Sequence, residues 1–145
     1  MLTYLPYADL RASVHALADA ELGLQRVVAR GILGCLRGRD SEELAHEPGV
    51  RMWAGYERTL AWLGMASCLE WRSRGRLDSL ASYFLGALRE IPAEQPSPEW
   101  LGWETLHRSH RSLLLREGSD AARYRAAFGA DLPDDLPLVF PKERV

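Results

Sequence analysis

Apolar residues recur every three or four positions along most of the chain, and no segment alternates apolar and polar residues as a strand does. A period near 3.6 is typical of amphipathic helices, whereas a half-buried strand has a period of two. The sequence therefore predicts an all-α protein. Helices are expected over residues 8–18, 19–37, 50–73, 77–90 and 103–117, followed by a last one that starts at 119–120 and stops at Gly129.

The helix predicted over residues 19–37 has Asp19 as its expected N-cap and carries apolar residues on two sides, which indicates a central, mostly buried helix. Arg26 interrupts one of the two apolar stripes. A buried guanidinium needs an acidic or phosphate partner. Arg26 is therefore either half of an internal ion pair or part of a binding site.

Two loop regions shape the rest of the chain. Residues 91–99 contain three prolines and are expected to form a surface loop inside one domain that spans residues 1–145, because neither side is large enough to fold alone. Ser41 is expected to cap a short turn through Glu42 and Glu43. The proline-rich end of the chain is expected to pack as an extended C-terminal arm.

Composition narrows the class of protein. The chain has 145 residues, 47% of them hydrophobic, and a net charge of −2, which describes an ordinary globular domain and not a protein that coats nucleic acid. No apolar run approaches the roughly 20 residues that span a bilayer, and no secretion signal is visible, so a cytoplasmic protein without a membrane partner is expected. Cys35 and Cys68 lie in apolar helical surroundings and are predicted to be buried free thiols.

The basic residues limit the possible covalent chemistry. Seventeen of the eighteen are arginine, and Lys142 is the only lysine. Imine-forming catalysis needs a neutral amine, and a guanidinium is always protonated. The candidate nucleophiles are therefore Lys142 and the α-amine of Met1.

The run His107-Arg108-Ser109-His110-Arg111-Ser112 is the most distinctive polar segment. Positions three and four apart share a helix face, so His107, His110 and Arg111 are expected to form one cation-capable surface that suits phosphate or another anion. The alternative is a solvated face with partly buried histidines. Glu104, His107 and His110 drift about 120° around a helix, too far for a tight metal site. No metal or other cofactor is expected.

Together with Leu22–Val27, Pro48–Glu57 and Pro133–Pro141, this run resembles the pyrimidine-dimer DNA glycosylases of the endonuclease V type. The resemblance extends from Thr3 to Pro141 and implies a compact multi-helix domain of that type. It also implies a reaction on damaged DNA, in which an N-terminal amine attacks the sugar C1′, forms an imine and permits strand cleavage. On this resemblance the expected catalytic residues are Met1, Arg26, His107 and His110, and the expected DNA-binding residues are Gln25, Arg51, Arg108 and Arg111.

The chain departs from that family pattern near the expected carboxylate. Val28 stands where the resemblance implies the catalytic glutamate, Leu24 stands where it implies a lysine, and Glu47 replaces a histidine. Valine carries no proton and stabilises no cation, and Glu21, two turns earlier on the same helix, could substitute only if the helix bends. A different acid would have to assist the amine.

Three functions remain open on the sequence. The first is a glycosylase/AP-lyase-like protein acting on damaged DNA, and the second is a non-catalytic DNA- or protein-binding module. The third is a small-molecule enzyme for an anionic metabolite, in a cleft made apolar by Leu24, Val28 and Leu113. The case for an inherited site requires that the amino end, Arg26 and the two imidazoles lie on one concave surface.

Overall fold

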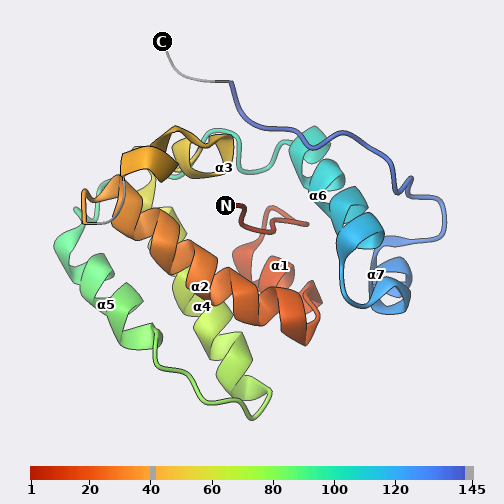
Figure 1. Ribbon diagram of the computed structural model, residues 1–145, viewed down its shortest axis with the longest axis horizontal. Coiled ribbons are helices and arrows are strands. Elements are labelled where there is room, and N and C mark those ends of the chain that lie inside the picture. Colours follow the sequence, from red (N-terminus) through yellow and green to blue (C-terminus); the bar gives the residue numbers. More distant parts are fainter. Residues whose placement is uncertain (40–41, 143–145) are drawn as a thin grey trace.

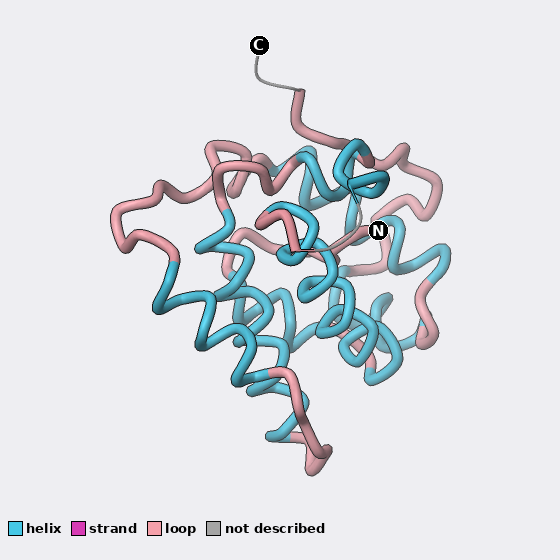
Figure 2. Tube along the Cα trace, turned by 60° about the vertical axis from the view of Figure 1, so that its left-hand side comes forward, coloured by secondary structure: helices cyan, strands magenta, loops and turns pink. Residues whose placement is uncertain are grey.

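The computed structural model describes residues 1–39 and 42–142, and Ser41 lies outside these ranges. Within them every regular segment is helical (Figure 2), so the all-α prediction is confirmed. The elements, in chain order, are α1 (Leu10–Ala16), α2 (Asp19–Leu36), the 3-10 helix η1 (Glu42–His46), α3 (Pro48–Arg51), α4 (Glu57–Ser73), α5 (Ala81–Glu90), α6 (Glu104–Glu117) and α7 (Ala121–Phe128).

Helix α4 is the centre of the helical packing, because it contacts α1, α2 and α5 (Figure 1). Helices α6 and α7 pack against each other on the other side of the N-terminal segment. One core cluster joins both groups, so the chain folds as a single domain. Its largest fully buried side chains include Leu22, Leu33, Trp53, Leu60, Phe84, Leu106 and Tyr124.

Helix α2 buries one of its two predicted apolar stripes more completely than the other. Leu22, Ala29 and Leu33 are fully buried, as a core face requires. On the other stripe Leu24 is 51% exposed and Val28 is only partly buried, whereas Cys35 is buried. The prediction of a helix buried on two sides is therefore confirmed for one side and only in part for the other. Asp19 is the first residue of α2 and not its cap, and its carboxylate binds Arg74 and Arg76.

The single long helix predicted over residues 50–73 is also wrong, because the chain turns between α3 and α4. Gly55 has a φ of 85°, a left-handed conformation that side-chain-bearing residues rarely adopt. Arg51, the last residue of α3, is exposed, whereas Trp53, within the turn, is fully buried. The apolar periodicity continues through the break, and it therefore gave no sign of the turn.

The N-terminal segment and the C-terminal arm both lie against α6. The N-terminal segment lies in the middle of the molecule, beside α2, α3 and α6 (Figure 1). The C-terminal arm crosses α6 as an extended segment, as predicted. No helix in the described ranges is both long and apolar enough to cross a bilayer.

Two helical glycines test this packing. A Cβ at Gly64 would lie 2.2 Å from the buried ring of Phe84, whereas one at Gly86 would meet no atom within 4 Å. We expect Gly64→Ala to lower the free energy of unfolding by about 1–3 kcal/mol through overpacking. The matched variant Gly86→Ala should raise it by about 0.5–1 kcal/mol, because alanine favours a helix interior. Urea denaturation measures both, and equal effects would contradict the close α4–α5 contact.

Candidate functional site

The two imidazoles of α6 bind one residue of the N-terminal segment. The backbone N–H of Leu5 donates to His110 Nδ1 at 2.9 Å, and His107 Nδ1 donates to the Leu5 carbonyl at 2.8 Å. His107 Nε2 accepts a further hydrogen bond from the Gly102 N–H at 2.8 Å. Both imidazoles are therefore neutral in this arrangement, since each accepts a hydrogen bond on one ring nitrogen.

Neighbouring residues of the segment are bound in the same manner by side chains. The Gln25 amide accepts from the Tyr4 N–H and donates to the Tyr4 carbonyl at 3.3 Å. Trp53 Nε1 donates to Thr3 Oγ1 at 3.1 Å, and Arg111 donates to the Pro6 carbonyl at 2.7 Å. We call residues 3–6 the N-terminal strap. Gln25 and Arg111, expected to bind DNA, bind the strap instead.

The expected cationic surface on α6 is wrong, because His107 and His110 are 1% and 0% exposed. The serines of the same run bind the C-terminal arm: Ser109 Oγ accepts from the Val139 N–H, and Ser112 Oγ donates to the Pro133 carbonyl. Arg108 alone among the polar side chains of His107–Ser112 is exposed. It lines a pocket of about 240 Å³ between α6 and the arm.

Burial, with a contribution from His107, lowers the pKa of His110 to about 3. Its Nε2 has no hydrogen-bond partner among the described residues. A histidine that remains uncharged at neutral pH supplies no positive charge to a phosphate. His110 acts on the position of the strap and not on an anion.

Arg26 forms an internal ion pair. Its guanidinium donates twice to Asp78 Oδ1, with the Nε contact at 3.0 Å, and lies 4.9 Å from the centre of the Trp71 ring. The Asp78 carboxyl is almost fully buried and also accepts from the Ala81 N–H at the start of α5. Burial alone would raise the pKa of Asp78, but hydrogen bonds from Arg26 and the backbone hold it below its usual range. The ion-pair alternative for Arg26 is confirmed.

The α-amine of Met1 lies against a carboxylate that the sequence did not assign. It is 2.5 Å from Glu47 Oε2, at the residue before α3, and Met1 is 43% exposed. Close packing fixes this end of the chain: a Cβ at Gly49 would lie 1.9 Å from the Met1 carbonyl oxygen. The Met1 side chain reaches Gly31 on α2, where a Cβ would be 2.9 Å from its terminal methyl. The amine is therefore held between α2 and α3, in contact with an acid and open to solvent.

The α-amine, Arg26 and the two imidazoles do not lie on one concave surface, as the inherited site would require. The amine lies beside Glu47, the imidazoles are buried around Leu5, and Arg26 is turned to Asp78. Val28 is one turn before Gly31 on α2, so the position where the resemblance implies a carboxylate does lie near Met1. It carries a valine, and the carboxylate comes instead from Glu47, the N-cap residue of α3. No sequence spacing connects residues 1 and 47, which is why Glu47 was missed.

Two further expected groups lie beside α3. Arg51 is exposed and lines a pocket of about 370 Å³ between α3 and the C-terminal arm. Lys142, the only lysine, lines the same pocket, with Met52 and Phe140 on its apolar side. Pro48, the residue after Glu47, lines this pocket, so the amine contact and one wall of the pocket lie next to each other in the chain.

Other candidates are excluded by their contacts. Glu21 is buried and accepts from the Tyr124 hydroxyl at 2.7 Å and the Ser119 N–H at 2.8 Å, so it does not assist the amine. The apolar cleft expected around Leu24 and Leu113 is wrong, because Leu24 is exposed and Leu113 is buried. Within the described residues no cluster of three potential metal ligands occurs. Cys35 and Cys68 are buried, as predicted, and are not joined by a disulfide. Burial raises the pKa of the Cys68 thiol to about 12.

No protein-family model, no curated protein and no solved structure matches this chain. Membership of the endonuclease V type therefore stays a prediction from the residues quoted above. The site is defined by its own geometry: an exposed amine, an adjacent carboxylate and a pocket along the same short helix.

The Arg26–Asp78 pair is testable by a double-mutant cycle. Arg26→Met leaves a buried carboxylate alone and should lower the free energy of unfolding by about 3–5 kcal/mol. Asp78→Asn keeps an acceptor for Ala81, and the double variant should lose less than the sum of the single losses, by about 0.5–3 kcal/mol. Urea denaturation supplies the four values. Unchanged or higher stability in Arg26→Met would indicate an anion site in place of an ion pair.

The buried imidazole should make stability depend on pH. The folded-state pKa of His110 is near 3, below its ordinary value of 6.5, so between these values the unfolded chain binds a proton that the folded chain does not. The stability that the protein derives from keeping His110 neutral is therefore fully present above about pH 6.5. Below that pH the free energy of unfolding falls by up to about 1.4 kcal/mol per pH unit.

The measurement compares urea denaturation at about pH 7 and pH 5, above the range in which ordinary carboxyls titrate. His110→Asn keeps an acceptor for Leu5 and should reduce this pH dependence. His15→Asn, at a side chain that is 81% exposed, is the matched control and should retain it. Equal pH dependence in the two variants would show that His110 is not the group responsible.

Proposed function

We propose that this protein is a DNA glycosylase/AP-lyase-like enzyme that forms an imine through the α-amine of Met1. The observation that carries the proposal is the 2.5 Å contact between this exposed amine and the Glu47 carboxylate. An amine must lose a proton before it attacks carbon, and an adjacent carboxylate accepts that proton. Glu47 thus supplies the acid–base function that Val28 lacks.

The proposed reaction begins at C1′ of a damaged or abasic nucleotide. The amine nitrogen bonds to C1′ and loses a proton, while the bond from C1′ to the base, or to the hydroxyl of an abasic site, breaks and its electron pair leaves with that group. The bond from C1′ to the ring oxygen then breaks, its electron pair goes to that oxygen, and the nitrogen lone pair forms the C=N bond. Transfer of the remaining amine proton to the ring oxygen gives the neutral imine. Removal of a C2′ proton then breaks the C3′–O bond, and water hydrolyses the imine to regenerate the amine. Glu47 is the proposed carrier of the amine protons.

The N-terminal strap supports this role because it orders the amine. A nucleophile on a free chain end loses conformational entropy when it reacts, whereas a positioned one has already lost it. Thr3, Tyr4, Leu5 and Pro6 are each bound by a side chain of the folded domain. In the proposal His107, His110, Gln25 and Arg111 are positioning residues, since they act on the strap and touch no substrate.

Recognition of DNA is assigned to two exposed cations at α3, the helix that follows Glu47. Arg51 and Lys142 are proposed to contact phosphates beside α3, where they line one pocket. The reactive sugar is inaccessible in a stacked duplex, so the nucleotide must be turned out of the helix. The pocket between α3 and the arm is the proposed receptor for it. With a net charge of −2, binding is expected to be local and to weaken with salt.

The experiment is borohydride trapping on DNA that contains one abasic site. Wild-type protein should give a covalent adduct at Met1, and Glu47→Gln should slow its formation by about 100-fold or more, the usual contribution of proton transfer. Glu94→Gln, at an exposed carboxylate outside the site, is the matched control and should behave as wild type. Acetylation of the amine should abolish the adduct. Mass spectrometry confirms that the Met1 amine is free and locates the adduct.

Several outcomes would contradict the proposal. A free Met1 amine with no adduct removes the lyase, and salt-sensitive binding without an adduct would favour the non-catalytic DNA-binding module. An adduct on Lys142 would show that the nucleophile is this lysine, in the pocket beside α3, and not the α-amine. Adduct formation at a normal rate in Glu47→Gln would remove the role of the carboxylate.

A further inference from the structure

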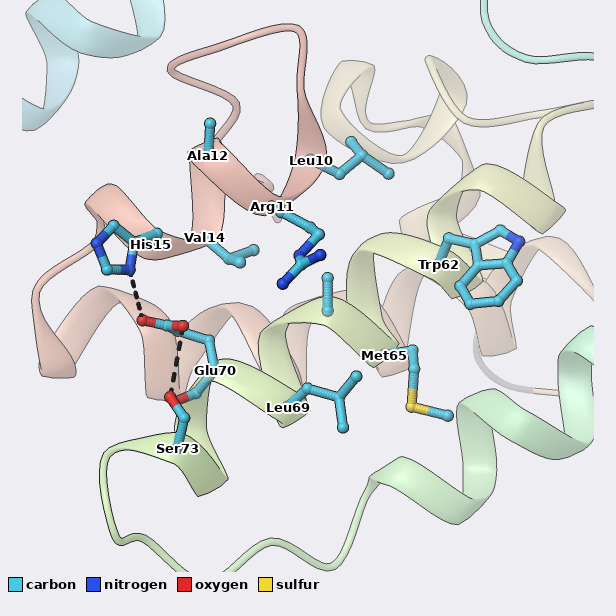
Figure 3. A pocket seen from close by; sticks show the side chains of 11 residues that line it. Leu10, Arg11, Ala12, Val14, His15, Trp62, Met65, Leu69, Glu70 and Ser73 are labelled. Carbon is cyan, nitrogen blue, oxygen red and sulfur yellow. Dashed lines mark hydrogen bonds and ion pairs between the residues drawn. The ribbon is translucent and has the colours of Figure 1, made fainter.

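A third pocket lies on a different part of the molecule, between α1 and α4. It has a volume of about 840 Å³, within the range of small-molecule pockets. Its walls are mainly apolar and come from both helices (Figure 3), with Leu10, Val14, Trp62, Met65 and Leu69 among them. Trp62 and Leu69 are about half exposed, at 49% and 55%. We call this feature the α1–α4 groove.

The charged side chains of the groove differ in whether they have a partner of opposite charge. Glu70 receives hydrogen bonds from His15, at 3.0 Å, and from Arg74, at 3.4 Å, so its charge is compensated. Arg11 extends from α1 toward α4 (Figure 3), and its guanidinium forms no hydrogen bond or ion pair with the described residues. The groove therefore presents one uncompensated cation over an apolar floor.

We propose that the α1–α4 groove binds an aliphatic monocarboxylate whose acid group pairs with Arg11 and whose chain lies along α4. Guanidinium binds a carboxylate through two parallel hydrogen bonds, which matches a single planar acid group. The groove follows α4 from Trp62 to Ser73, about 16 Å by the rise of a helix, and this length suits an extended alkyl chain. Met65 and Leu69 contact that chain, and Arg11 fixes its polar end.

Charge and shape favour this ligand over other occupants. A dicarboxylate or a phosphate ester would bring a second negative charge, for which the groove has no second unpaired cation among its described residues. An uncharged hydrocarbon would leave Arg11 without a partner. This site is distinct from the Met1–Glu47 site, which lies on α2 and α3, so the two proposals stand or fall separately.

The test is displacement of a dansyl-labelled undecanoic acid by unlabelled acids below their micellar concentrations. Affinity should rise from octanoate through decanoate to dodecanoate by up to about fourfold per methylene, the gain expected for burying a CH₂ group. The alcohol of the same length should bind roughly tenfold more weakly than the acid, since it loses the charge-assisted contact with Arg11.

Two variants and two matched controls locate the site. Arg11→Gln should weaken binding of the acid by roughly tenfold and leave binding of the alcohol unchanged. Arg89→Gln makes the same charge change at an exposed residue of α5 and should leave the binding of both unchanged. Leu69→Gln should weaken binding of the acid and of the alcohol to the same degree. Leu77→Gln, at a side chain that is 97% exposed, should change the binding of neither. Circular dichroism confirms that each variant keeps its helical content.

Three results would overturn the proposal. The first is the absence of displacement by any of the acids, and the second is an acid affinity that Arg11→Gln leaves unchanged. The third is a concentration-dependent dimer, seen by light scattering, that Leu69→Gln dissociates. That result would assign the groove to a second copy of the chain.

Discussion

The fold depends on how the buried peptide groups of Leu5 are satisfied. Leu5 is fully buried and lies outside every helix, and its hydrogen-bonding groups have no strand in the described residues to pair with. A buried N–H or carbonyl without a partner costs about 1–3 kcal/mol, so side chains must supply what a sheet would have supplied. His107 and His110 do so, one accepting and one donating. The strap is therefore bound within the domain much as a peptide ligand is bound.

The need to bind the strap explains why the His-Arg-Ser triplet is repeated, and no bound anion is required to account for it. Three residues advance a helix by about 300°, so equivalent members of successive triplets stay on nearly the same face. The two histidines face the strap, and the serines face the C-terminal arm. Arg108 falls between these two sets and is exposed, whereas Arg111 reaches the Pro6 carbonyl. One helix thus binds both the strap and the C-terminal arm.

The sequence predicted what depends on local periodicity and little of what depends on distant contacts. The helices and their all-α class follow from apolar spacing, and Asp120 and Gly129 bound α7 as expected. The turn at Gly55 was missed because apolar spacing continues through it. Whether Arg26 was paired could not be decided, because Asp78 lies 52 positions away. The amine–carboxylate contact was invisible for the same reason, although both residues had been noted separately.

The strap couples the position of the amine to the stability of the domain. Loss of His107 or His110 would free the backbone of Leu5 and so displace Met1, four residues away, while exposing the core that the strap covers. A loss of activity in such a variant would therefore not identify an imidazole as a reacting group. Glu47 differs, because its carboxylate is 41% exposed and contacts the amine itself. A substitution at Glu47 can change the reaction without unfolding the domain, whereas a substitution at either histidine changes both. Variants of Glu47 therefore test the proposed function more directly than variants of the histidines.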